Sequence, residues 1–195
     1  IKLLLERGAN PNAYQVQNYK RRTPLMSLLQ DCDRDVWENF EKFRRSDVNF
    51  KLCDEERRSV LVYAIKCTRV LISQSLREAY RAKHEGAKHE EAKEEDKKAQ
   101  QAALGEIYKI CEYMIDKERK FLLNVVSRSG KNVLHYACEY GLTKLITEHF
   151  LEARVPAYHR QGREGRSPYD LIKGNAKNAE GNRESADPLG TEKAM

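Results

Sequence analysis

Four short apolar runs along the chain each follow a small polar residue. The four segments are RRTPLMSLLQD (21–31), RRSVLVYAIKC (57–67), GKNVLHYACEYG (130–141) and GRSPYDLIKG (165–174). Their polar residues are Thr23, Ser59, Asn132 and Ser167. Side chains of Thr, Ser and Asn accept hydrogen bonds from the free N–H groups of a first helical turn. The pattern therefore predicts four helices that begin at these positions.

A second pattern lies out of phase with the first. Amphipathic stretches that end in a turn occur at 2–13, 40–50, 117–126 and 148–157. Gly8 stands where the end of a helix favours a left-handed residue, a conformation that glycine adopts without steric cost. Each unit of the chain is thus predicted to contain two helices followed by an extended turn.

The spacings between successive polar start residues are 36, 73 and 35 residues. The first and last match one helix-pair unit of about 33 residues, and the middle one matches a unit with an insertion of about forty. The segments TPLM (23–26) and NVLHYA (132–137) resemble the T-P-L-H-x-A motif of the ankyrin-repeat family. GANPNA (8–13) and SDVNF (46–50) resemble its closing G-A-D-V-N-A turn.

The resemblance implies an all-α fold, an ankyrin-type helical repeat solenoid with short projecting turns and an inserted helical hairpin. We expect the repeat array to span residues 1–174, with the insertion at about 68–103. Residues 175–195 contain few large apolar side chains and are expected to be disordered. The chain starts without Met, and its first helix exposes an apolar side, so we expect further repeats before it in a larger protein.

The inserted segment is rich in balanced charge. Residues 77–98 hold seven basic and seven acidic side chains. Apolar residues at helical spacing flank this stretch on both sides, which predicts two helices joined by a turn near Gly86. The segment is interpreted either as a solvated spacer or as a docking surface for a helical partner.

Composition restricts the cellular setting. The longest apolar run is six residues, Val60–Ile65, which is too short for a membrane helix. The net charge is +6, and five widely spaced cysteines contain no C-x-x-C pair. Free thiols are therefore expected, in a reducing, cytoplasmic compartment.

The motif with the most reactive side chains is GKNVLHYACEYG (130–141), and it is interpreted as a packing unit. A phosphate-binding loop would need Gly at Val125 and Ser or Thr at Asn132. In the resembled family His135 would hydrogen-bond between turns, and Cys138 is expected on the buried side of its helix. His84 and His89 are five residues apart and do not share a helix face. We therefore expect no enzymatic activity, no catalytic residue, no cofactor and no metal.

Ankyrin-like arrays bind proteins through projecting turns and a concave helix face, so the resemblance implies a protein partner. The turns are mostly basic, which favours a partner with acidic segments. Tyr and Arg are enriched at interface hot spots. The predicted partner-binding residues are Tyr19, Arg21, Arg22, Tyr63, Lys66, Arg128, Tyr136, Glu139, Tyr140 and Arg160.

Several alternatives stay open. The tyrosines at 63 and 136 could pack against neighbouring repeats instead of facing a partner. The chain could be a structural spacer within a longer array. Nucleic-acid binding is less favoured, because the acidic residues 54–56 interrupt the basic stripe. The degenerate repeats and the Lys/Glu/Ala-rich insertion also resemble ankyrin-like effectors that intracellular bacteria secrete, which would place the protein in a host cytosol. The oligomeric state is left open.

Overall fold

The computed structural model describes residues 5–17, 20–31, 36–44, 47–68, 70, 89–140, 142–150, 165 and 167–171. This part of the chain is mostly helical, as the sequence predicts, with one pair of three-residue strands. The upstream arm and tip of the predicted hairpin, and the tail 175–195, lie outside the described residues. No described helix has both the length and the apolar composition needed to cross a membrane.

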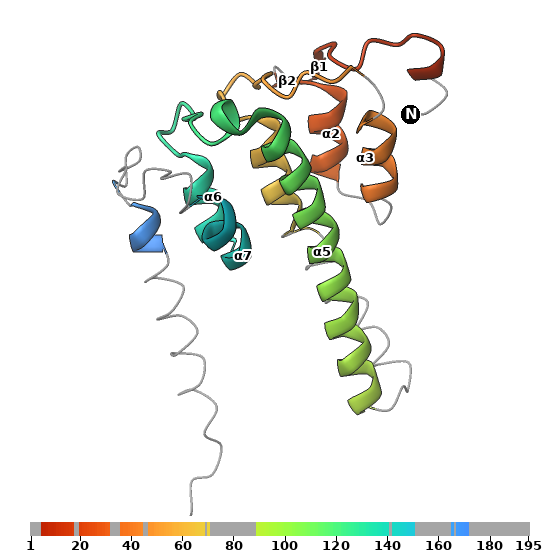
Figure 1. The fold of residues 1–195 in the computed structure, drawn as a ribbon, viewed down its shortest axis with the longest axis vertical. Coiled ribbons are helices and arrows are strands. Elements are labelled where there is room, and N and C mark those ends of the chain that lie inside the picture. The colour runs from red at the N-terminus through yellow and green to blue at the C-terminus, as the bar shows by residue number, and fades with distance from the viewer. Residues whose placement is uncertain are drawn as a thin grey trace, which may run out of the picture.

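The described helices stand side by side in a row (Figure 1). Helices α2 and α3 pack together at one end, α5 contacts α3, and α6 packs against α7 and η1. An additional helix covers residues 60–68. The bounds are α2, Pro24–Asp31; α3, Val36–Arg44; α5, His89–Leu122; α6, Val133–Glu139; α7, Thr143–Leu145; and the π-helix η1, Ile146–Phe150.

Extended turns precede the helices at equivalent places. Strands β1 (Gln15–Gln17) and β2 (Lys20–Arg22) form an antiparallel hairpin directly before α2. A single bridge, Cys53 to Ser59, precedes helix 60–68, and another, Val126 to Asn132, precedes α6. The paired residues are six positions apart in both bridges, so the chain reaches these two helices through turns of the same length.

These two turns also share their hydrogen bonds. The amide of Asp54 donates to the carbonyl of Arg58 at 3.1 Å, and Ser127 donates to Lys131 at 2.9 Å. The side chains of Asp54 and Ser127 accept in return from the amides of Arg58 and Lys131, at 2.7 and 3.1 Å. The left-handed residue is Gly130 in one turn and Arg57 in the other. The two units therefore have the same turn geometry despite different sequences.

The predicted start residues are all buried, but they act differently. Asn132 and the Nδ1 atom of His135 form a reciprocal capping box at the start of α6. The Oγ1 atom of Thr23 accepts from the Met26 amide at 3.3 Å, and Ser167 forms a similar contact with Asp170. The Oγ atom of Ser59, in contrast, has no hydrogen-bond partner among the described residues. Three of the four predicted side-chain caps are thus present.

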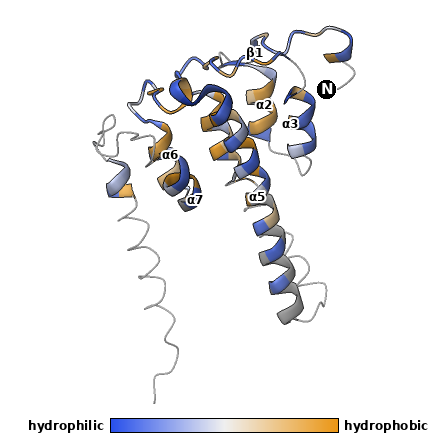
Figure 2. Ribbon diagram, in the orientation of Figure 1, coloured by the Kyte–Doolittle hydropathy of each residue, from blue (hydrophilic) through white to orange (hydrophobic). Residues whose placement is uncertain are grey.

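The core runs along the row of helices, as the apolar colouring in Figure 2 shows for α2, α6 and one end of α5. At one end Phe40 and Phe43 are almost fully buried. Trp37 stacks on Phe40 with 5.9 Å between ring centroids, and Tyr113 from α5 meets the same ring edge-on at 5.7 Å. Aromatic side chains of α3 and α5 therefore pack together in the core at this end.

Helix α5 has two different halves. Its apolar positions Ile107, Ile110 and Met114, which the helical spacing singled out, are at most 1% exposed. Toward its start, the described side chains at Glu94 and Lys98 are exposed. The helix is interrupted at Glu118, whose backbone is non-helical. The downstream arm of the predicted hairpin is thus helical, and only the second half of this helix packs into the core.

Candidate functional site

The most distinctive polar cluster lies on α2, helix 60–68 and α6, which we call the first helices. A basic residue stands directly before the start residue of each of these helices: Arg22, Arg58 and Lys131. A tyrosine stands four residues after two of the start positions, at 63 and 136. These side chains thus recur at the same sequence positions relative to the start residues Thr23, Ser59 and Asn132.

Each tyrosine ring lies between two cations. The guanidinium carbons of Arg22 and Arg58 are 5.9 and 5.8 Å from the centroid of the Tyr63 ring. The ammonium nitrogens of Lys66 and Lys131 are 5.6 and 5.5 Å from the centroid of Tyr136. These distances lie within the range of cation–π attraction. Each pair of cations comes from two neighbouring units, so the contacts join the units together.

Asp54 is the buried counterion of this cluster. One of its carboxylate oxygens accepts from the Nε atom of Arg58 at 2.6 Å and from the hydroxyl of Tyr63 at 2.8 Å. Burial, followed by the hydrogen bond to Asp54 and its charge, raises the pKa of Tyr63 to about 12. Tyr63 therefore stays neutral and donates its proton to Asp54 over the physiological range.

A pocket of about 370 Å³ opens beside Tyr63. Its lining combines cationic and apolar side chains: Arg22, Leu29, Gln30, Arg58, Tyr63, Lys66, Cys67 and Val70. Burial, followed by the positive charge of Arg58, lowers the pKa of Lys66. The protonated form of Lys66 is thus less stable in this pocket than in water.

Two of the cations near the pocket are not in direct contact with a carboxylate of the described residues, although Glu139 and Asp54 act on Lys66 from a longer distance. Arg58 is paired with Asp54, and Lys131 is paired with Glu139 at 2.9 Å. Arg22 and Lys66 form no ion pair in the described part of the chain, and the buried Nε atom of Arg22 has no hydrogen-bond partner there. The pocket therefore carries an excess of positive charge.

The predicted partner-binding tyrosines are not displayed as expected. Tyr63 and Tyr136 are only 3% and 5% exposed, and Tyr140 is partly buried against the core. The expectation of an exposed concave row of tyrosines is therefore wrong for the first two, because their rings fill the space between neighbouring units. Packing against adjacent units, the alternative left open by the sequence, describes their position.

The remaining predicted residues are more accessible. Arg21 is exposed, its guanidinium lies 3.9 Å from the ring centroid of Tyr14, and its amide donates to Glu55. Arg128 and Glu139 are also exposed. Tyr19 and Arg160 lie outside the described residues. The structure thus brings Arg22, Tyr63, Lys66, Tyr136 and Glu139 into one cluster and leaves Arg21 and Arg128 at the turns.

Two members of the cluster, Asp54 and Arg58, were not among the predicted site residues. The acidic run 54–56 predicts a charged interruption of the basic stripe, whereas Asp54 itself is buried, with 5% exposure. A signal for Arg58 was present, because it occupies the same place before a helix as Arg22 and Lys131. Comparison of the three turns would have identified it.

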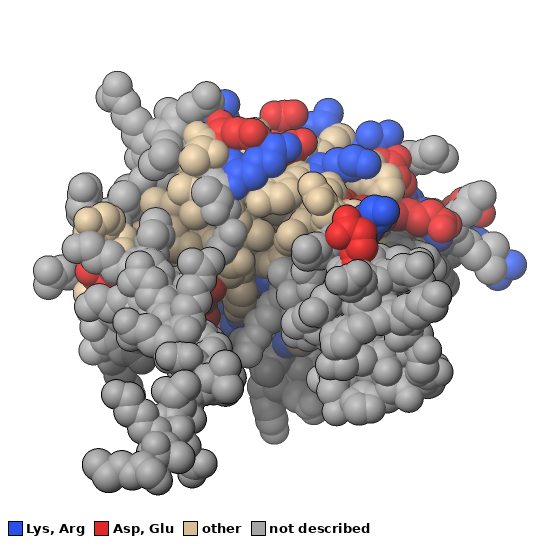
Figure 3. All heavy atoms as spheres, turned by 90° about the horizontal axis from the view of Figure 1, so that it is seen from below, with Lys and Arg blue, Asp and Glu red and all other residues tan. Residues whose placement is uncertain are grey.

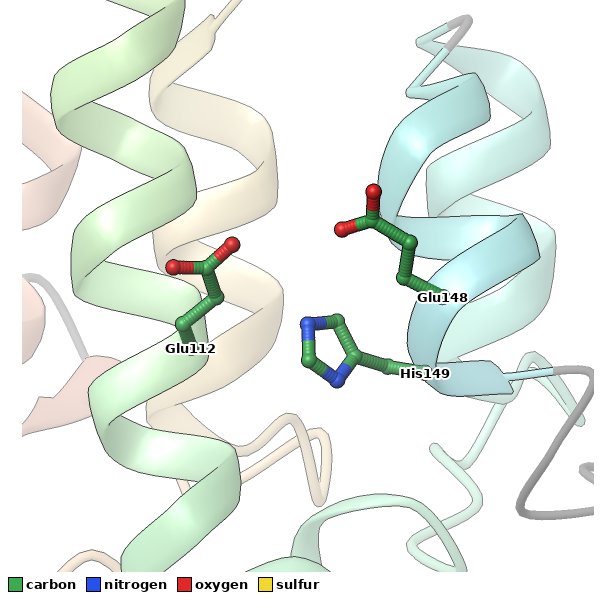
Figure 4. A group of neighbouring side chains, drawn as sticks. All are labelled: Glu112, Glu148 and His149. Atoms are coloured by element: carbon green, nitrogen blue, oxygen red, sulfur yellow. The ribbon is translucent and has the colours of Figure 1, made fainter.

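A second cluster joins α5 to η1 (Figure 4). One potential ligand atom from each of Glu112, Glu148 and His149 lies within 4.8 Å of the other two. The ammonium of Lys144 is 3.3 Å from a Glu112 oxygen and 3.7 Å from a Glu148 oxygen. A protein cation therefore already bridges the two carboxylates, and the cluster is an interhelical ion-pair network.

The thiols do not resemble activated nucleophiles. Burial raises the pKa of Cys138 to about 11 and raises that of Cys111 further. Cys138 is buried, as predicted, and Cys53, Cys111 and Cys138 are free. Cys67, in contrast, is disulfide-bonded, so the expectation that all five thiols are free is wrong for this residue.

No family model matches the chain, and no curated protein is similar enough to be counted as a relative.

Proposed function

We propose that the chain is an ankyrin-type repeat solenoid that acts as a non-catalytic protein-binding module. Its partner would contact the first helices and the neighbouring turns. The repeated turn hydrogen bonds at Asp54 and Ser127, and the buried start residue of each first helix, support the repeat architecture. The unit length of about 35 residues, with two helices and a turn, is similar to that of an ankyrin repeat, and this similarity supports the proposal.

One observation carries the proposed binding role, namely the unpaired positive charge around the pocket beside Tyr63. Surface cations without an ion pair cost little, but Arg22 and Lys66 are half-buried, and the positive charges of Arg58 and Lys131 act on Lys66. A partner that brings negative charge would offset this cost and gain affinity. An acidic protein segment fits this requirement and agrees with the basic turns.

A structural spacer is the second candidate, and the burial of Tyr63 and Tyr136 favours it. Both rings already have packing partners within the chain, so the cluster also serves to hold neighbouring units together. Nucleic acid is a weaker candidate. Along one edge of the molecule Lys and Arg alternate with Asp and Glu instead of forming a continuous basic surface (Figure 3).

An affinity capture with paired variants tests the proposal. The native chain, an Arg22→Ala/Lys66→Ala variant and a Lys42→Ala/Lys109→Ala variant would be used to capture proteins from a cytosolic lysate. The control pair removes the same number of charges from α3 and α5, away from the pocket. Circular dichroism must first show that all three proteins have the same helix content.

We expect one protein to be retained by the native chain and the control variant and lost from the pocket variant. Equal retention by all three would move the binding surface away from the pocket. No specific retention by any of them would favour the spacer.

A further inference from the structure

The chemistry of the pocket beside Tyr63 restricts what a partner can place there. The following inference deepens the proposed function and rests on it. A cavity of about 370 Å³ is of the size that holds a large side chain or a small ligand. Arg22, Arg58 and Lys66 line it together with the apolar groups of Leu29 and Val70. An occupant should therefore combine an anionic head with an apolar stem.

The ion pairs within the cluster indicate how much negative charge an occupant of the pocket should carry. Arg58 is neutralised by Asp54 at 2.6 Å, and Lys131 by Glu139 at 2.9 Å. Arg22 and Lys66 remain, and neither has an ion pair among the described residues. The four cations of the cluster thus face two carboxylates, Asp54 and Glu139, which leaves two positive charges in excess. A carboxylate would neutralise only one of them, whereas a phosphate monoester carries nearly two negative charges at neutral pH.

The donors are also held in place before any ligand arrives. The Arg22 and Arg58 guanidinium groups lie against the Tyr63 ring, and the hydroxyl of that ring is held by Asp54. The Nε atom of Arg22 is buried without an acceptor in the described part of the chain, which is a costly state for a donor. Guanidinium groups bind phosphate oxygens with several N–H groups at once, so clustered Arg side chains favour phosphorylated ligands.

We infer that this pocket binds a phosphorylated side chain of the partner protein. Arg22 and Lys66 provide the charge that the phosphate neutralises, Arg58 borders the phosphate, and the half-buried Val70 contacts the stem. The phenyl ring of phosphotyrosine would bury more apolar surface against this lining than the short side chain of phosphoserine. Phosphotyrosine is therefore the preferred occupant.

Titration of the full 195-residue chain with small probes tests this inference without knowledge of the partner. The probes are phenyl phosphate, inorganic phosphate and benzoate, followed by amide and Lys side-chain chemical shifts. Phenyl phosphate should bind saturably at one site, at least about tenfold more tightly than benzoate, because benzoate has one charge. Inorganic phosphate should bind more weakly than phenyl phosphate, because it lacks the stem. Binding should also raise the pKa of Lys66.

Variants identify the site. Lys66→Met and Arg22→Gln should each weaken phenyl phosphate binding by about tenfold or more. Lys109→Met removes a cation that likewise lies over an aromatic ring, Trp37, and should leave the affinity unchanged. If a variant unfolds, the comparison of phenyl phosphate with benzoate on the native chain still decides the question.

Three results would overturn the inference. They are equal affinity for phenyl phosphate and benzoate, binding that never saturates, and binding that is the same in the Lys66 and Lys109 variants. Tighter binding of a short oligonucleotide that displaces phenyl phosphate would assign the pocket to nucleic acid instead. The chain could fail to bind phenyl phosphate and still capture a partner protein through Arg22 and Lys66. That result would overturn the phosphate inference but would support the proposed protein-binding function.

Discussion

At the scale of single residues, Arg57 is the position where the backbone conformation conflicts with the side chain. Its φ is +59°, and the equivalent residue in the next turn is Gly130, with φ of +80°. A left-handed conformation costs a residue with a Cβ atom about 1 kcal/mol or more, and it costs glycine almost nothing. The second unit therefore has the same turn geometry, but Arg57 occupies the left-handed position that glycine favours.

Arg57→Gly is expected to stabilise the protein by about 0.5–1 kcal/mol in urea unfolding, because it removes this strain. Arg57→Ala is the matched control, since it removes the same side chain but keeps the Cβ atom, and it should give no gain. The explanation fails if the Ala and Gly variants have equal free energies of unfolding.

Tyr63 gives the protein a sensitivity to alkaline pH. Its pKa is about 12 in the folded chain, above the unfolded value of about 10. The folded state therefore holds this proton more tightly, so the contribution to stability is complete below pH 10 and is lost as the pH rises toward 12. The loss should reach about 2–3 kcal/mol, because the pKa rises from about 10 to about 12.

Tyr63→Phe should reduce the loss of stability between pH 9 and pH 12, measured by urea unfolding at several pH values. It should not abolish the loss, because burial also raises the pKa of Cys138 and Tyr108, which act in the same direction. Tyr169 is 48% exposed, and Tyr169→Phe serves as the control. An unchanged slope in the Tyr63 variant would show that its hydroxyl is not held as described.

At the scale of elements, α5 combines an anchored and an exposed half. Residues 107–115 include five side chains that are at most 1% exposed, whereas Glu94, Lys98, Gln101 and Ala102 are exposed. Protection of backbone amides follows the burial of the helix that carries them. We expect hydrogen exchange in peptides from residues 89–101 to be complete well before that in peptides from 107–115. Equal protection of both halves would require a partner surface along the first half.

The starts of helices could be predicted from the sequence where they depend on neighbouring residues. The start residues Thr23, Asn132 and Ser167 identified three capped helices, since a cap depends on side chains within one turn. The left-handed state of Arg57 had no local signal, because Arg ordinarily avoids it. The buried Asp54 also escaped prediction, because its acidic neighbours suggested an exposed loop.

At the scale of the whole molecule, the cluster of cations and tyrosines joins residues from neighbouring units and could not be predicted from one motif. Arg22 and Tyr63 lie 41 positions apart in the sequence, and Lys66 and Tyr136 lie 70 apart. Equivalent helices place them together only when the units stack in register. The types of residue were identified from the sequence, but the burial of the tyrosines depends on the neighbouring unit.

The central claim is that a partner protein contacts the first helices, and site-specific photo-crosslinking tests it most directly. A photoreactive amino acid would replace Gln30, which is exposed at the rim of the pocket, and in a separate variant Asp116, which is exposed on α5. Both variants would be irradiated in a cytosolic lysate under the same conditions. The account predicts a discrete crosslinked protein from position 30 that is absent from position 116 and is lost when Arg22 and Lys66 are replaced. Crosslinks from position 116 alone, or none from either position, would contradict it.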